Sequence, residues 1–362
     1  MAKIKVAVIF GGKSNEHDVS VVSAAHVIKS IRQVSDERYE VVCIGITKKG
    51  HWLKYIGSVE DIENGRWETH PDNTPCILSP DPVHKGFITL DEDGTYSRLR
   101  VDCIFPVLHG KNGEDGTIQG IFEMSELPFV GCDLLSSANC MDKDLTHTVL
   151  EASGIRTAKW VRILLSEMNR LDEKCKEMEE KLGFPMYVKP ANCGSSVGIS
   201  KCRNADELRA GIKAAFIHDR KVIVEEEIKG IECECAVMGN EDAFASTVGE
   251  ISAANEFYDY DAKYNDQGSK TYIPARISEE SIEEIRRIAV KAYHAMGCGG
   301  LSRVDFFLCE DGTVILNEIN TLPGHTKISM FPQLMEHEGI SCPEQEDRLI
   351  KLALDRSEVD YE

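Results

Sequence analysis

The first predicted element is a short run of apolar residues that ends in two glycines. Residues 4–10 are rich in β-branched side chains, and Gly11 and Gly12 follow them directly. Such a run is typical of a strand that is buried on both faces, as in a parallel sheet. Residues suited to capping a helix come next, followed by a helix-like stretch over residues 19–28. This order of strand, tight turn and helix predicts an open α/β sheet, whose ligands bind at the carboxyl ends of its strands.

The rest of the chain carries enough elements for further domains. Its 362 residues are sufficient for two or three. Further strands are expected at residues 41–46, 101–108, 185–188 and 198–201, and helices at 143–152, 167–181, 205–216 and from 279 onward. Residues 252–270 show no periodicity, and a stretch of this length inside a domain is expected to be a lid or a disordered segment.

Composition excludes several classes of protein. Apolar residues make up 42% and charged residues 28%, as in soluble globular proteins. No apolar run approaches the roughly 18 residues of a membrane span and no signal peptide is recognisable, so we expect a cytoplasmic protein with no membrane partner. The net charge of −20 argues against a nucleic-acid partner, which requires a basic face. The 13 cysteines include no C-x-x-C pair and are expected to be free thiols.

The strongest chemical signal is a predicted hairpin near the end of the chain. Arg303 and Asp305 are two residues apart, as are Glu318 and Asn320, so each pair lies on one face of its strand. A two-residue turn at 311–312, or a four-residue loop, puts Asp305 opposite Glu318 and Arg303 opposite Asn320. Facing carboxylates repel each other, and a divalent cation such as Mg²⁺ between them relieves the repulsion. The alternative is a solvated polar face with Arg303 as the counter-ion.

Two other stretches indicate a nucleotide site. Residues 192–198 are mostly small, so their backbone N–H groups can fold around phosphate oxygens, with Lys189 supplying a positive charge. Alone, such a loop is often only a hairpin turn. Residues 222–232 predict a strand followed by three glutamates and Gly230. This pattern fits either an exposed acidic hinge or a connector that binds a purine amine and a ribose.

The turns after the first and third predicted strands offer weaker signals. Residues 12–14 look like the end of a P-loop, but its first glycine would fall at Ala7 inside the strand, so that motif is rejected. The first turn can still bring Glu16 to the edge of the sheet, and His109 lies in a comparable loop. A lone Glu or His at such an edge is more often structural than functional.

Taken together, the sequence resembles the ATP-grasp D-alanine–D-alanine ligases over roughly residues 6–353. Seven strings carry the resemblance, in order: FGGKSNEHDVS at 10–20, HGKNGEDG at 109–116, MDK at 141–143, GSSVG at 194–198, FYDYDAKY at 257–264, RVD at 303–305 and NEINTLPG at 317–324. Chance agreement with all seven is not credible. The resemblance implies an ATP-grasp fold of α/β and α+β class with three domains. These are an N-terminal open parallel-sheet domain at 1–132, a central subdomain at 133–226, and a C-terminal domain at 227–356 with the metal site and the lid.

The resemblance also implies where ATP and metal ions bind. ATP would lie between the central and C-terminal domains. Its contacts are assigned to Lys143, Lys189, Ser196 and Lys263 for the phosphates, to Glu225 and the backbone of Glu226 to Ile228 for adenine, and to Glu232 for ribose. Asp305, Glu318 and Asn320 would bind two Mg²⁺ or Mn²⁺ ions, in agreement with the hairpin register. A monovalent cation is a further candidate.

The amino-acid substrates are assigned to the other end of the site. Glu16 would hold the ammonium of the first D-alanine near His109, and Ser329 the carboxylate of the second near Met330. Arg303 and the Gly324 N–H would stabilise the oxyanion, and Ser195 and Tyr264 would form a hydrogen-bonded network with Glu16.

The implied activity is ligation of two D-alanines through a D-alanyl phosphate, at the expense of ATP, for peptidoglycan precursors. A D-alanine–D-serine ligase is the alternative. The intact Lys263-Tyr264 pair argues against D-lactate, and Tyr258 and Met330 are of the alanine-using type. The family is usually dimeric, so a homodimer is expected. A non-catalytic relative with the same fold is disfavoured because Glu16, Lys189 and the metal ligands are all present.

Two residues depart from the family pattern. His325 stands where a larger apolar residue is common, and its expected place beside the second-substrate site raises the hypothesis that it affects acceptor preference or pH dependence. Cys193 lies in the phosphate loop and raises the hypothesis of sensitivity to oxidation.

Overall fold

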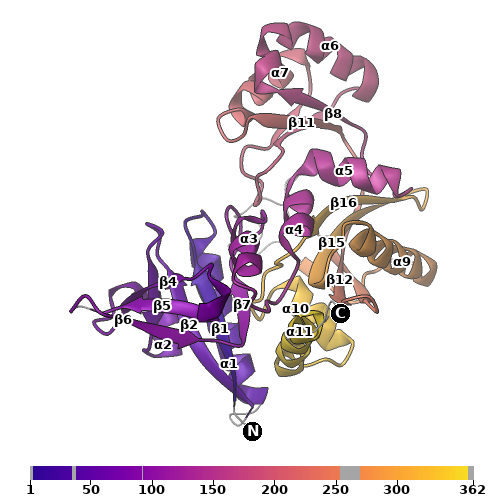
Figure 1. Cartoon of the computed structure of the whole chain (residues 1–362). Helices are drawn as coiled ribbons and strands as arrows, with labels where there is room; N and C mark the ends of the chain where they lie inside the picture. Colours follow the sequence, from indigo (N-terminus) through magenta and orange to yellow (C-terminus); the bar gives the residue numbers. More distant parts are fainter. Residues whose placement is uncertain (1–2, 35–37, 92, 253–269, 358–362) are drawn as a thin grey trace, which may run out of the picture.

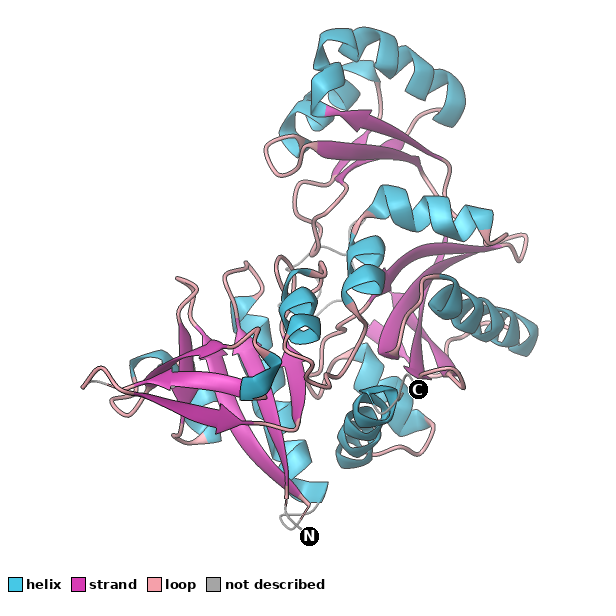
Figure 2. Cartoon of the chain, viewed as in Figure 1, coloured by secondary structure: helices cyan, strands magenta, loops and turns pink. Residues whose placement is uncertain are grey.

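Three separate β-sheets make up the framework of the molecule (Figures 1 and 2). The computed structural model describes residues 3–34, 38–91, 93–252 and 270–357. The sheets follow one another along the chain, with seven, four and five strands. These sheets, one partly parallel and two antiparallel, confirm the predicted mixed class.

The first sheet is parallel only in part. Its order is β6-β5-β4-β3-β2-β1-β7, with β1 (Ile4–Gly11) parallel to both β2 (Tyr39–Ile46) and β7 (Cys103–Val107). The other four strands are antiparallel: β3 (Trp52–Tyr55), β4 (Thr74–Leu78), β5 (Gly86–Leu90) and β6 (Tyr96–Arg100). The three parallel strands are those that the sequence predicted, and the antiparallel extension was not expected. Helices α1 (His17–Val34) and α2 (Val59–Glu63) pack together beside this sheet.

The second sheet is antiparallel and has a hydrophobic core of its own. Its order is β10-β9-β11-β8, formed by β8 (Trp160–Leu164), β9 (Met186–Pro190), β10 (Ser200–Cys202) and β11 (Lys221–Glu226). Helices α6 (Leu171–Leu182) and α7 (Ala205–Ala215) lie over one face of it, at the top of Figure 1. Asn204 caps α7, accepting hydrogen bonds from the N–H groups of Asp206 and Glu207.

The third sheet carries the predicted hairpin. Its order is β14-β13-β12-β15-β16, formed by β12 (Gly230–Gly239), β13 (Phe244–Ser252), β14 (Lys270–Tyr272), β15 (Gly300–Cys309) and β16 (Val314–Asn320). Helix α9 (Glu279–Ala295) begins after its cap Ser278 and buries its apolar stripe on this sheet. Helices α4 (Leu134–Met141) and α5 (Lys143–Ala152) also pack on this side, while α3 (Thr117–Met124) contacts α4.

The last two helices join the first and third sheets. Helix α10 (Met330–His337) packs on β12 and β13, and α11 (Cys342–Ser357) packs on α1 and β7. Their buried side chains belong to the same core as those of β1 and α1. The first and third sheets are therefore held together by a continuous apolar core, whereas the second sheet has a separate one.

The register of the hairpin is as predicted, but it arises differently. Asp305 pairs with Glu318 and Arg303 with Asn320. The predicted two-residue turn is wrong, because Cys309 and Thr313 close a three-residue loop that moves the register by one position. A bulge between Asp305 and Phe306 moves it back. Two offsets therefore cancel, and the four polar residues face one another.

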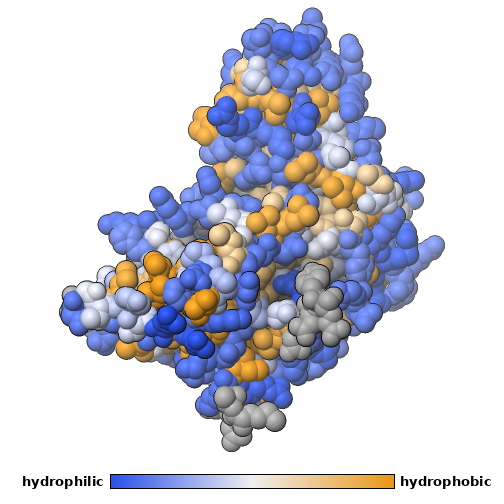
Figure 3. All heavy atoms as spheres, viewed as in Figure 1, coloured by the Kyte–Doolittle hydropathy of each residue, from blue (hydrophilic) through white to orange (hydrophobic). Residues whose placement is uncertain are grey.

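The outside of the molecule is mostly hydrophilic on the face drawn in Figure 3, in keeping with the high content of charged residues. Among the residues that the structure describes, no helix is long and apolar enough to cross a membrane. All 13 cysteines are free, as predicted, and most of them are buried.

Candidate active site

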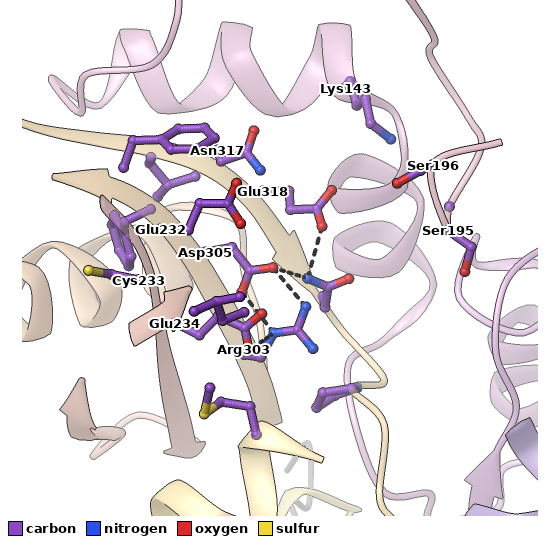
Figure 4. A pocket seen from close by; sticks show the side chains of 18 of the residues that line it. Lys143, Ser195, Ser196, Glu232, Cys233, Glu234, Arg303, Asp305, Asn317 and Glu318 are labelled. Carbon is purple, nitrogen blue, oxygen red and sulfur yellow. Dashed lines mark hydrogen bonds and ion pairs between the residues drawn. The ribbon is translucent and has the colours of Figure 1, made fainter. Parts of the chain in front are cut away.

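A cavity of about 600 Å³ lies where the three sheets meet. Its walls include every predicted site residue that falls within the described part of the chain, from Glu16 in the first sheet to Met330 in α10. Figure 4 shows the acidic side chains of β12, β15 and β16 facing the loop that carries Ser195 and Ser196. Segments that are far apart in sequence thus share one site.

The turn after β1 brings Glu16 to the cavity. Gly11 has a φ of +87°, and a Cβ there would lie 2.2 Å from the carbonyl oxygen of Ile46, so only glycine fits. The turn is then fixed by Ser20, whose hydroxyl accepts a hydrogen bond from the Gly11 N–H at 2.7 Å. Helix α1 starts immediately after Glu16, which places this carboxylate at the carboxyl end of the parallel strands.

Glu16 is bound by the loop of small residues from the second sheet. The Ser195 hydroxyl donates a hydrogen bond to Glu16 Oε1 at 2.5 Å. Ser195 and Ser196 have φ values of +49° and +58°, a left-handed conformation that costs free energy for residues other than glycine. On the other side, a Cβ at Gly110 would lie 2.3 Å from Glu16 Oε2. The carboxylate is therefore confined between two loops.

Two groups next to Glu16 have pKa values shifted toward their neutral forms. Burial lowers the pKa of His109, although the Glu16 carboxylate opposes this. Its Nδ1 lies 3.1 Å from the carbonyl oxygen of Leu322. Desolvation, together with Glu16, raises the pKa of Glu114 well above its usual range, even though Glu114 accepts a hydrogen bond from the Gly110 N–H. The surroundings of Glu16 thus favour the neutral forms of both neighbours.

The opposite end carries the lysines. Lys189 Nζ lies 2.6 Å from Glu225, whose other oxygen lies 2.8 Å from His147 Nε2. Burial alone would raise the pKa of Glu225, but Lys189 and His147 overcome this and lower it to about 2. Lys143 donates a hydrogen bond at 2.8 Å to the carbonyl oxygen of Cys193 in the loop of small residues. Positive charge is thus held beside that loop by defined partners.

Between the two ends lies the polar face of the hairpin. Arg303 donates two hydrogen bonds to Asp305, at 2.8 and 2.7 Å, and its Nε lies 3.0 Å from Glu234 of β12. The Asn320 side-chain amide donates to Asp305 at 3.0 Å and, more weakly, to Glu318 at 3.4 Å. Arg303 therefore acts as a counter-ion, as the alternative to a metal site predicted.

The same residues also suit a divalent cation. Within the described ranges, no three His, Cys, Asp or Glu side chains are gathered closely enough to hold a metal ion by themselves. Asp305 and Glu318 nevertheless offer carboxylate oxygens on adjacent strands, and a flip of the Asn320 amide adds a carbonyl oxygen. Mg²⁺ is usually held by one or two carboxylates together with substrate phosphates. The donor set therefore fits a metal ion that arrives with a nucleotide.

The last wall of the cavity is formed by residues 322–330. Ser329 is the N-cap of α10, and its Oγ accepts a hydrogen bond from the Thr326 N–H at 3.1 Å. Met330 begins the helix and is buried. A hydroxyl at the amino end of a helix is well placed to bind a carboxylate.

Comparison with known proteins identifies the family. Residues 5–132 match the model "D-ala D-ala ligase N-terminus", and residues 149–351 match "D-ala D-ala ligase C-terminus". The chain belongs to the D-alanine–D-alanine ligase family. A D-alanine–D-alanine ligase of Thermoanaerobacter sp. strain X514 is 47% identical, with 98% of each chain covered.

Solved structures of family members have the same fold. The VanG D-Ala:D-Ser ligase of Enterococcus faecalis superposes with a TM-score of 0.89 at 43% identity, covering 97% of this chain and 99% of that one. The D-alanine–D-alanine ligase of Coxiella burnetii superposes with a TM-score of 0.85 at 33% identity, covering 99% of this chain and 95% of that one.

Three family residues that the sequence assigned lie outside the described residues. These are Tyr258, Lys263 and Tyr264.

The expected position of His325 is wrong. It does not line the cavity formed by the described residues, although Gly324 before it and Thr326 after it both do. Its ring is 4% exposed and packs between Phe105 and Phe331. His325 therefore faces the core behind the cavity wall.

Three titratable residues next to the predicted site residues were not singled out from the sequence. Glu114 lies near Glu16, Glu234 contacts Arg303, and His147 contacts Glu225. Simple spacing could have found two of them. Glu234 lies two residues after Glu232 and so shares its strand face, and His147 lies four residues after Lys143 on α5.

Cys193 does line the cavity, but its thiol is not activated. Burial raises its pKa, while Lys143 partly opposes this. A raised pKa leaves little thiolate at neutral pH, which argues against unusual reactivity.

Proposed function

We propose that this protein ligates two D-alanines to D-alanyl-D-alanine, using ATP and passing through a D-alanyl phosphate, to supply peptidoglycan precursors. The observation that carries the proposal is that the lysines, the facing carboxylates and the Glu16–Ser195 pair all line one cavity. Membership of the D-alanine–D-alanine ligase family supports the same activity.

ATP binds at the lysine end in this proposal. Lys143 and Lys189 hold its phosphates, and Ser196 adds a donor from the loop of small residues. Adenine contacts Glu225 and the backbone from Glu226 to Ile228, and Glu232 binds the ribose. Because Glu225 is already ionised and oriented by Lys189 and His147, it can accept a hydrogen bond from an amine without rearrangement.

Metal ions complete the phosphate site. Asp305, Glu318 and Asn320 would hold two Mg²⁺ or Mn²⁺ ions, and a monovalent cation is a further candidate. Bound there, the ions would neutralise the charge that develops on the transferred phosphoryl group. Arg303 would keep Glu234 as an anionic partner if Asp305 bound a metal ion.

The first D-alanine is activated at the Glu16 end. Glu16 holds its ammonium group, and its carboxylate attacks the γ-phosphate of ATP to give D-alanyl phosphate and ADP. His109 lies beside this substrate and is held in one orientation by its contact with Leu322. Ser195 fixes Glu16 through their hydrogen bond. Lys263 and Tyr264 are proposed to contact the γ-phosphate and the Glu16–Ser195 network from the family resemblance alone.

The second D-alanine enters at the wall formed by residues 322–330. Ser329 and the amino end of α10 bind its carboxylate, with Met330 beside it. Its amine attacks the acyl carbonyl, and Arg303 with the Gly324 N–H stabilises the resulting oxyanion. Collapse of this tetrahedral species forms the peptide bond and releases phosphate.

The proposed organisation follows from the same resemblance. We propose three domains, at residues 1–132, 133–226 and 227–356. Within the second, α4 and α5 pack on the third sheet. A homodimer in the cytoplasm is proposed as well.

Phosphate release from ATP tests the proposed function directly. We expect release that depends on D-alanine, with D-alanyl-D-alanine identified by mass. D-Serine offered in competition distinguishes the alternative acceptor, and D-lactate is expected to be inactive. The absence of any D-alanine-dependent release would refute the proposal.

A further inference from the structure

A cluster of titratable groups lies behind the cavity wall and has no role in the reaction described above. His26 belongs to α1, His325 to the segment after β16, and Glu346 to α11. His325 is 4% exposed and Glu346 is 0% exposed. In the described part of the chain, no hydrogen-bond partner is found for His26 Nε2, His325 Nε2 or either carboxyl oxygen of Glu346. Several of the structure's unpartnered buried polar atoms thus gather at one place.

His325 and Glu346 are each other's polar partner in this cluster. His325 Nε2 lies 3.6 Å from Glu346 Oε2. On the other side of the ring, Nδ1 lies 3.4 Å from the carbonyl oxygen of Pro323. Both side chains are buried, so a broken contact would leave polar atoms without a partner where water is excluded. The contact therefore joins the segment after β16 to α11.

The surroundings offer the pair no replacement partner. The titratable groups around His26, His325 and Glu346 are Lys29 of α1, His109 after β7, Glu336 of α10 and Cys342 of α11. Burial lowers the pKa of His26, opposed by Glu346, which favours its neutral form. Phe105 and Phe331 cover the His325 ring. Among the described residues, His325 is the one basic side chain within ion-pair distance of Glu346.

The pair is joined directly to the acceptor wall. His325 follows Gly324 in the chain, so its ring and the Gly324 N–H belong to adjacent residues. The same segment is held at Leu322 by His109 and at Thr326 by Ser329. The segment is thus held at three points, and the contact of His325 with Glu346 lies between the other two.

We propose that the buried contact between His325 and Glu346 positions residues 322–329 and thereby sets the Gly324 amide and the Ser329 hydroxyl for the second D-alanine. This inference rests on the proposed roles of Gly324 and Ser329. His325 and Glu346 are positioning residues, since neither lines the cavity that the described residues form. When the contact is lost, the segment is displaced, and KM for the second D-alanine rises.

Two single variants test the pair. In Glu346→Gln the side-chain amide can still donate to His325 Nε2, so we expect a KM for the second D-alanine near the wild-type value. In His325→Phe the contact is lost, and we expect this KM to rise about tenfold, with KM for ATP unchanged.

A matched control separates positioning from simple stability. Gln345 is the neighbouring buried polar residue of α11, and it donates to the carbonyl oxygens of Pro332 and Ile340 instead. Gln345→Leu is expected to lower Tm but to keep the wild-type KM. If His325→Phe does not fold, the double variant His325→Leu, Glu346→Leu replaces both groups with apolar ones and removes the buried unpaired carboxylate.

The outcomes distinguish this inference from the proposed function. Wild-type enzyme without D-alanine-dependent phosphate release would overturn the proposed function. An active wild type whose folded His325→Phe variant keeps its KM for the second D-alanine would overturn the positioning role alone.

Discussion

The two ends of the cavity control their charges in opposite ways. At the nucleotide end, charges are kept by pairing, since Lys189 and Glu225 lie 2.6 Å apart, and the adjoining hairpin pairs Arg303 with Asp305 in the same way. At the amino-acid end, the pKa shifts of His109 and Glu114 favour their neutral forms. Paired charges remain fully developed and can reorganise around an incoming polyanion. Shifts toward neutral forms beside Glu16 favour this carboxylate as the main charge that a substrate ammonium meets.

This difference predicts that substitutions of ionisable residues by neutral ones have larger effects at the nucleotide end than at the amino-acid end. Removing a charge at the nucleotide end leaves its buried partner uncompensated, which costs more than the pair itself contributes. Removing an ionisable group at the amino-acid end changes little where that group is already neutral. The predictions below test this contrast, beginning with the largest expected effect.

Asp305→Asn is expected to lower kcat about a thousandfold. It removes a carboxylate proposed to hold a metal ion and leaves Arg303 with Glu234 as its remaining anionic partner among the contacts described. Phosphate release measured over a series of Mg²⁺ concentrations checks the effect, and a raised Mg²⁺ requirement identifies its cause. Asp311→Asn, in the exposed loop of the same hairpin, is the control and should retain normal activity. If the two variants had the same kcat and the same Mg²⁺ requirement, Asp305 would not be a metal ligand.

Ser195→Ala is expected to lower kcat about 10- to 100-fold. The hydroxyl donates to Glu16, and a hydrogen bond to a charged group contributes about 1.5–3 kcal/mol. Without this hydrogen bond, Glu16 is no longer tied to the loop of small residues. Steady-state rates at saturating ATP measure the loss, with Ser200→Ala at the start of β10 as a control on the same sheet. Unchanged kcat in Ser195→Ala would show that Glu16 is positioned without this bond.

Glu225→Gln is expected to raise KM for ATP about tenfold and to change the pH dependence of stability. The folded-state pKa of Glu225 is lowered to about 2, below its ordinary value, so ionised Glu225 stabilises the fold at neutral pH. This contribution is complete above the unfolded-state pKa and is lost as pH falls toward 2. Urea unfolding of both proteins should therefore show a stability difference near pH 7 that shrinks below about pH 4.5. A difference that does not vary with pH would contradict the pairing.

The sequence predicted the chemistry of the third sheet better than the shape of the first. Long apolar runs and the alternation of Arg303 with Asp305 are local patterns, and both survive in the structure. Strands β3 to β6 were missed because they are short and partly exposed, so they lack the strong apolar pattern of buried strands. The hairpin register was correct although its turn was not, since a bulge compensated for the loop.

Side-chain direction outside regular elements was the least predictable property. His325 follows Gly324 in a segment without helix or strand, so no periodicity indicates which way its ring points. Its position depends on packing with α11 and α1, which come from distant parts of the chain. Glu114 was missed for a similar reason, because its pKa depends on Glu16 across two loops.

Glu114→Gln is expected to have the smallest effect and tests the amino-acid end directly. Since the pKa of Glu114 is raised well above its usual range, the folded protein binds a proton that the unfolded chain releases, and stability falls as pH rises from the unfolded-state pKa toward the folded one. A glutamine mimics the neutral carboxyl and removes this penalty. We therefore expect near wild-type kcat and a Tm raised by a few degrees at neutral pH, with the gain disappearing at about pH 4.

The control for this variant is Glu123→Gln. Glu123 also accepts a hydrogen bond from a backbone N–H, that of Leu134, but it lies away from the cavity. Its substitution should not raise Tm. If Glu114→Gln instead lowers kcat as strongly as Ser195→Ala, Glu114 works as an anion, and the amino-acid end keeps its charges in the same way as the nucleotide end.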